Sequence, residues 1–120
     1  MSLSLFAQLA VILVIVLHIC FMILEMFLWD KPIGLKVFSQ GKEQASQTRV
    51  LAANQGLYNG FLAAGLIWGL VRGSHGIESL LFFLTCILIA GIFGALSVKR
   101  SILYIQALPA AIALILIHFS

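Results

Sequence analysis

Four long apolar runs, separated by polar connections, dominate this sequence of 120 residues. They cover approximately residues 3–29, 50–71, 77–98 and 102–119. A helix needs about 20 mostly apolar residues to cross the hydrocarbon core of a bilayer. The run at 102–119 is the shortest and still suffices for a span. The pattern therefore predicts four membrane-spanning helices.

The composition supports lipid as the surrounding solvent. The chain is 62% hydrophobic and 9% charged, whereas soluble domains carry about 25% charged residues. A soluble domain of this length could not cover so much apolar surface. The seven Lys and Arg residues are divided among the three connections, so they form no basic stripe of the kind that binds nucleic acid. We expect an all-α fold, an integral membrane four-helix bundle, as one domain over residues 1–120.

The first run is expected to be a span rather than a signal peptide. Residues 3–28 exceed the apolar core of a signal peptide, which has about 7–15 residues. No Lys or Arg precedes the run, and no Ala-x-Ala cleavage site follows it.

The basic residues predict an orientation. Six of them lie in the first and third connections, and the second connection carries only Arg72. These six are Lys31, Lys36, Lys42, Arg49, Lys99 and Arg100. Cytoplasmic loops of membrane proteins carry an excess of Lys and Arg. We therefore expect the first and third connections to be cytoplasmic, with both termini on the other side of the membrane. Dual topology stays open.

The connection over residues 30–49 is the only long one. Trp29 is expected to anchor the first helix at the interface, and Pro32 and Gly34 are expected to break that helix. Three apolar residues are expected in the headgroup region: Leu35, Val37 and Phe38. Residues 43–48 are good helix formers and are expected to begin the second helix. The alternative is a soluble binding loop.

Two ionisable residues lie inside the first run. His18 and Glu25 are seven residues apart, so they share one helix face about 10 Å apart along the axis. Ionisable groups within a span usually face other helices or a wet cavity. Glu25 could instead reach the nearby interface, and His18 could make a structural hydrogen bond.

The second run carries polar and small residues together. Asn54 and Tyr58 are four residues apart, as are Gln55 and Asn59. Glycines at 56 and 60, and again at 65 and 69, have the spacing that lets membrane helices approach closely. A similar pattern of small residues occurs at 90–95, and these faces could also support a homo-oligomer. The alternative for the amides is hydrogen bonding between helices only.

The expected depths of these polar residues coincide. The fourth run adds Gln106, followed by Pro109, which is expected to kink its helix. With about 1.5 Å per residue, all except His18 lie within roughly 6–14 Å of the cytoplasmic boundary, and His18 lies near the midplane. The predicted ligand-binding residues are His18, Glu25, Asn54, Gln55, Tyr58, Asn59 and Gln106.

No metal or cofactor is predicted. Cys20 and Cys86 lie inside apolar runs and are interpreted as small buried hydrophobic residues. His18 and His118 are expected at different depths, which disfavours haem ligation.

One stretch is specific enough for a comparison. The pattern His18…Glu25-Met26-Phe27-Leu28-Trp29, followed by Ala52-Ala53-Asn54-Gln55-Gly56-Leu57-Tyr58-Asn59-Gly60, resembles the domain-of-unknown-function family 1304. The resemblance covers essentially the whole chain. It implies a small four-helix protein of the bacterial inner membrane, and it implies no substrate or mechanism.

Three functions are consistent with these residues. The first is binding, or translocation, of a small amphipathic or apolar ligand in a cytoplasmic-side polar cavity, with Glu25 as charge partner or proton site. The second is a structural or subunit role in which the polar groups only pack helices. The third is a membrane enzyme of the isomerase type, with His18 and Glu25 as acid and base. The catalytic residues, if any, stay unassigned, and the partners expected are the lipid bilayer and the ligand.

Overall fold

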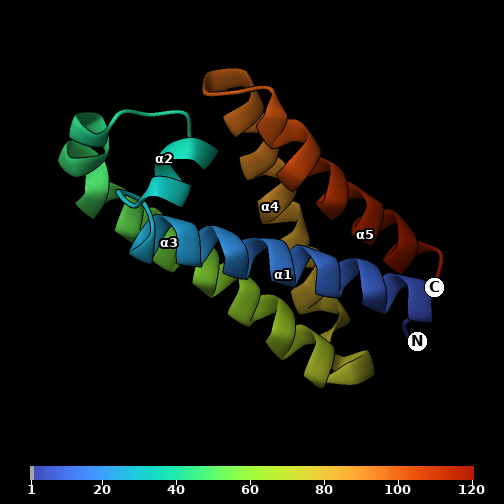
Figure 1. Ribbon diagram of the computed structural model, residues 1–120. Helices are drawn as coiled ribbons and strands as arrows, with labels where there is room; N and C mark the ends of the chain where they lie inside the picture. The colour runs from blue at the N-terminus through green and yellow to red at the C-terminus, as the bar shows by residue number, and fades with distance from the viewer. Residues whose placement is uncertain (1) are drawn as a thin grey trace. The chain divides into compact units, whose positions relative to one another are not determined.

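The computed structural model describes residues 2–120, and the regular structure in this range is entirely helical (Figure 1). The helices are α1 (Leu5–Phe27), α2 (Pro32–Val37), α3 (Lys42–Val71), α4 (Ile77–Ser97) and α5 (Leu108–His118). A 3-10 turn, η1 (Gly73–Gly76), precedes α4, and a π-helical turn, η2 (Leu103–Ala107), precedes α5. The all-α prediction is confirmed for these residues.

The connection after α1 contains more helix than the sequence predicted. α1 ends at Phe27, and α2 starts at Pro32. Proline is well tolerated in the first turn of a helix, because the amide it lacks would have no partner there. α3 begins at Lys42, as the helix-forming residues 43–48 indicated. Glu43 lies in its first turn, where a carboxylate favours the helix dipole.

Two helical segments are long and apolar enough to cross a membrane. They are Leu5–Met26 and Gly73–Ser97, and 22% of each apolar window is buried within the protein. The helical stretch Leu103–His118 is apolar but shorter. α3 does not join the first two, because its first half carries charged and amide residues.

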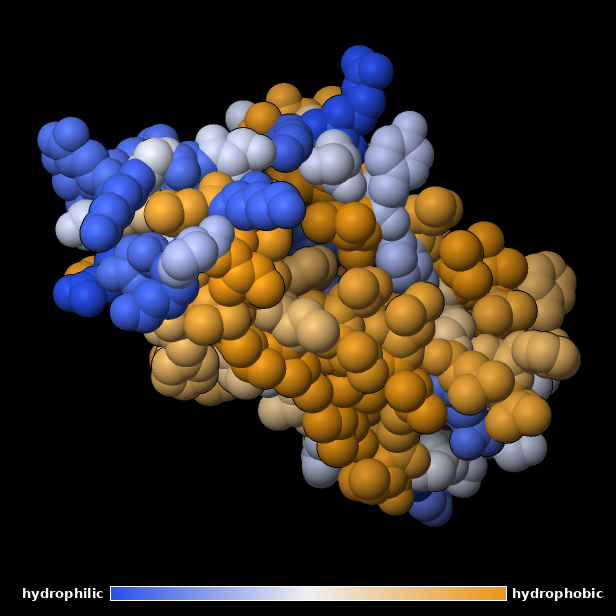
Figure 2. Space-filling model, viewed as in Figure 1, coloured by the Kyte–Doolittle hydropathy of each residue, from blue (hydrophilic) through white to orange (hydrophobic). Residues whose placement is uncertain are grey.

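The chain divides into two compact units, whose boundaries fall within α1 and α3. The first, which we call the terminal unit, contains the chain up to Leu17 and residues Leu62–Ser120. The second, which we call the central unit, is His18–Phe61. Figure 2 shows hydrophilic side chains over α2 and the first turns of α3, and apolar side chains over α5.

In the terminal unit, α4 packs against η2 and α5. A Cβ on Gly91 would lie 2.5 Å from the backbone nitrogen of Ala107, and one on Gly94 would lie 3.0 Å from Ile102. The small residues predicted at 90–95 therefore permit this close packing. The inward face of α4 also carries three fully buried residues: Leu80, Leu84 and Ile87. Near the chain ends, the Ser4 amide donates to Ser120 Oγ at 3.2 Å.

The predicted distortion before Pro109 takes the form of the π-helical turn η2. Proline has no N–H, so it cannot donate to the carbonyl four residues earlier. The Leu108 amide donates instead to the carbonyl of Leu103, five residues earlier. Such wider turns are a usual way for a helix to absorb a local break in its hydrogen bonds.

Candidate functional site

The central unit is built on a close approach of α1 and α3. A Cβ on Gly56 would lie 2.7 Å from Met26 Cγ and 3.0 Å from Glu25 Cβ. A Cβ on Gly60 would lie 2.7 Å from Met22 Sδ. A larger residue at either position would force the neighbouring side chains of α1 to move. The Gly56–Gly60 pair therefore acts as the packing surface that the sequence indicated.

This approach brings Glu25 and Asn59 together. Asn59 Nδ2 donates a hydrogen bond to Glu25 Oε1 at 2.5 Å. Both side chains belong to half-buried residues. A hydrogen bond to an ionised carboxylate is shorter and stronger than one between neutral groups. The contact thus links α1 to α3 through a polar pair.

His18 lies deeper in the same unit. It is fully buried, and its ring packs edge-on against Phe21 with 5.3 Å between centroids. A substrate would have to displace the surrounding side chains to reach this imidazole. The environment is that of a structural histidine.

Three of the other predicted site residues are exposed on α3: Asn54, Gln55 and Tyr58. Asn54 is exposed and donates to the Val50 carbonyl of its own helix at 3.0 Å. Gln55 and Tyr58 are exposed, and the Tyr58 ring lies 6.0 Å from that of Phe61. Gln106 is half-buried in η2, in the terminal unit.

Three contacts that hold α2 were not anticipated from the sequence. Trp29 Nε1 donates to Thr48 Oγ1 at 3.0 Å, and the Trp29 ring lies 4.6 Å from that of Phe38. Gly34 is buried against the carbonyl oxygens of Leu28 and Trp29. The sequence did contain one signal for such a contact, the indole N–H of Trp29 near a helix end. Buried indole N–H groups usually donate to an acceptor. The sequence predicted an interfacial position for Trp29, and it did not predict the contacts with Thr48 and Phe38.

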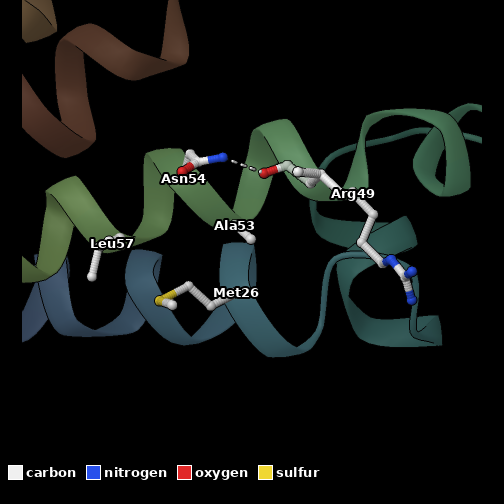
Figure 3. Close-up of a pocket in the computed structure, with 6 residues that line it drawn as sticks. Met26, Arg49, Ala53, Asn54 and Leu57 are labelled. Carbon is white, nitrogen blue, oxygen red and sulfur yellow. Dashed lines mark hydrogen bonds between the residues drawn. The ribbon is translucent and has the colours of Figure 1, made fainter.

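An open groove of about 380 Å³ lies beside these contacts (Figure 3). It is lined by Met26 from α1 and by five residues of α3: Arg49, Val50, Ala53, Asn54 and Leu57. Arg49, Ala53 and Leu57 follow one another at four-residue intervals, so they form a row along one helix face. Figure 3 shows Arg49 at one end of this row and Leu57 at the other. The groove therefore has a cationic end and apolar walls.

Arg49 is paired only loosely. Its guanidinium lies 3.8 Å from the Asp30 carboxylate, and the two side chains are 63% and 27% exposed. Ion pairs this exposed contribute at most about 1 kcal/mol. An anion entering the groove could replace Asp30 at little cost. The sequence analysis used Arg49 only as a topology signal and did not place it beside Asp30 or in a groove.

Among residues 2–120, no group of three or more His, Cys, Asp or Glu side chains is placed so that it could hold a metal ion. Cys20 and Cys86 are free thiols. Cys20 is exposed rather than buried, because it lies on the outward face of α1, which corrects the expectation for this residue.

The comparisons with known proteins place these features in a family. Residues 12–118 match the model of a family described as protein of unknown function (DUF1304). The chain belongs to this family. The DUF1304 match runs from α1 through α5, so it includes Glu25, Asn59 and the groove residues. The family predicted from the sequence is confirmed.

The chain is also similar to a bacterial protein that is described as uncharacterized. The uncharacterized protein YpaA of Lactococcus lactis subsp. lactis (strain IL1403) is 33% identical over 96 residues, which cover 78% of this chain and 81% of YpaA. No solved structure matches the chain. The function must therefore be inferred from the site.

Proposed function

We propose that this DUF1304 member is an integral membrane protein that binds a small anionic amphiphile in the groove beside Arg49. In this proposal α1, α3, α4 and the η2–α5 segment cross the bilayer, with the first and third connections in the cytoplasm. Two helical segments have the necessary length and hydropathy, and most of their residues are not buried in protein. The core helix of a soluble protein would be mostly buried.

The side chains that line the groove indicate which class of ligand would fit it. Met26, Val50, Ala53 and Leu57 provide apolar walls, and the guanidinium of Arg49 provides the cation. Binding sites are typically apolar clefts with a few polar groups that fix ligand orientation. Guanidinium groups bind carboxylates through paired hydrogen bonds. The nine residues from Arg49 to Leu57 span about 12 Å of helix, which suits a medium-length alkyl chain with an acidic head.

We expect opposite effects from neutralising the two members of the Asp30–Arg49 pair. Arg49→Gln removes the cation and should weaken binding of octanoate about tenfold or more, since hydrogen bonds to charged groups contribute about 1.5–3 kcal/mol. Asp30→Asn removes the competing carboxylate and should strengthen binding. Calorimetric titration of the purified, detergent-solubilised protein measures both.

Lys42→Gln is the matched control, because Lys42 is an exposed cation of the same unit that does not line the groove. Octan-1-ol and octylamine test the need for an acidic head. Equal losses in Arg49→Gln and Lys42→Gln would indicate nonspecific charge attraction and contradict the proposal. Equal binding of octanoate and octylamine would do the same.

A purely structural role is the second candidate, favoured by the Glu25–Asn59 hydrogen bond between α1 and α3. Interhelical polar contacts of this kind hold membrane helices together without any ligand. This candidate predicts no saturable binding of octanoate and no difference between Asp30→Asn and the parent protein.

A further inference from the structure

The short helix α2 exposes two apolar side chains next to two cations. Ile33 and Val37 are 52% and 49% exposed. They are four residues apart, so they lie on one face of the helix. Lys31 precedes α2 and Lys36 lies in its last turn, and both are exposed. About half of each of these two apolar residues therefore stays exposed on this short helix.

Other residues in and next to α2 pack against the ends of α1 and α3. Gly34 is buried against the backbone at the end of α1. Phe38, just after α2, packs on Trp29, which in turn donates to Thr48 of α3. These contacts fix α2 against the ends of two helices. The face with Ile33 and Val37 is therefore held outward rather than left free to fold inward.

We propose that α2 lies in the headgroup region of an anionic membrane leaflet. Ile33 and Val37 insert at the boundary with the acyl chains, and Lys31 and Lys36 bind the phosphates of anionic headgroups. A surface helix with apolar and basic residues side by side is suited to this position, and juxtamembrane cations are attracted to anionic lipids. The inference rests on the membrane placement proposed above, since it needs α1 to end at the same interface.

Charge favours a lipid over a second copy of the chain. The connection carries Lys31, Lys36, Lys42 and Arg49 against Asp30 and Glu43. Asp30 is already turned toward Arg49, which leaves the surface around α2 positive. Two such surfaces would repel each other, whereas phosphatidylglycerol supplies both a complementary charge and an apolar layer for Ile33 and Val37.

The test places an environment-sensitive fluorophore on α2. Ile33→Cys is introduced with Cys20→Ala and Cys86→Ala, labelled with a nitrobenzoxadiazole dye, and reconstituted in phosphatidylcholine vesicles with or without phosphatidylglycerol. We expect a blue-shifted emission that shallow nitroxide lipids quench several-fold more strongly in the vesicles containing phosphatidylglycerol. Lys31→Gln with Lys36→Gln should remove this dependence on phosphatidylglycerol. Unchanged Trp29 fluorescence before labelling, measured in a Trp68→Phe background, verifies the fold of each variant.

Gly41→Cys is the matched control, because a side chain at Gly41 meets nothing within 4 Å. Its label should stay in water in both kinds of vesicle. The proposal is overturned if the label at position 33 is as exposed to water as the label at position 41. It is also overturned if the position 33 signal does not depend on phosphatidylglycerol, or if that signal changes with protein concentration.

Two outcomes distinguish a failure of the proposed groove function from a failure of the proposal for α2. A protein removed from vesicles by alkaline washing overturns both ideas. Loss of octanoate binding alone, with the position 33 signal intact, overturns only the groove.

Discussion

Gly34→Ala is expected to lower the melting temperature of the protein well below that of Gly41→Ala. A Cβ on Gly34 would overlap the carbonyl oxygen of Leu28 and lie 2.7 Å from that of Trp29. Backbone atoms cannot rotate away as the end of a flexible side chain can, so α2 must shift as a whole. Overpacking of this kind costs about 1–3 kcal/mol. Thermal unfolding in detergent, followed by circular dichroism, measures the difference.

The control isolates the close contact from the general effect of replacing glycine. Gly41 precedes α3 and has open space around it, so alanine there meets nothing. A second readout follows from the position of Trp29, which contacts Phe38 and Thr48. Gly34→Ala should alter Trp29 fluorescence in a Trp68→Phe background, and Gly41→Ala should not. Equal melting temperatures for the two variants would show that α2 does not depend on this contact.

The long helices could be predicted because their signal is repeated over many residues. The apolar runs located α1, α4 and the last helix within a few residues, and the helix formers before Val50 indicated the early start of α3. α2 could not be predicted in this way, because six residues are too few for a periodic pattern. Pro32 and Gly34 were expected to break the first helix, which does end at Phe27. The new helix that Pro32 opens, and the contact with the end of α1 that Gly34 permits, were not expected.

The site was only partly predictable because a sequence does not fix the rotation of each helix about its axis. Asn54, Gln55, Tyr58 and Asn59 were equal candidates to face Glu25. At about 100° per residue, Asn59 lies about 60° from Gly56 around the helix, and Asn54 and Tyr58 lie about 160° away. Gly56 marks the face of α3 that touches α1. The glycine spacing therefore contained the signal that singles out Asn59.

The groove was missed for a different reason. Its cation, Arg49, was used only as a topology signal, and its apolar residues were counted only as parts of the long helices. Only the three-dimensional arrangement shows that Met26 of α1 faces the Arg49–Leu57 row of α3. A contact between helices joined by a long connection has no local signature in sequence.

The second large effect is expected at the polar pair between α1 and α3. Asn59→Ala removes the amide that donates to Glu25 and leaves a half-buried carboxylate without that partner. Leaving such a group unsatisfied costs about 1–3 kcal/mol or more. Asn54→Ala is the matched control in the same helix, because the Asn54 amide bonds only to the Val50 carbonyl at the exposed surface. The melting temperature should fall substantially for Asn59→Ala and little for Asn54→Ala.

Glu25→Gln separates the charge from the hydrogen bond. Its side-chain oxygen can still accept from Asn59 Nδ2, so this single variant should be destabilised only slightly. Asn59→Ala should then cost less in the Glu25→Gln background than in the parent, because a neutral amide is cheaper than a carboxylate to leave unpaired. A double-mutant cycle on the melting curves gives this coupling directly. Additive effects would mean that the charge of Glu25 adds nothing to its hydrogen bond with Asn59.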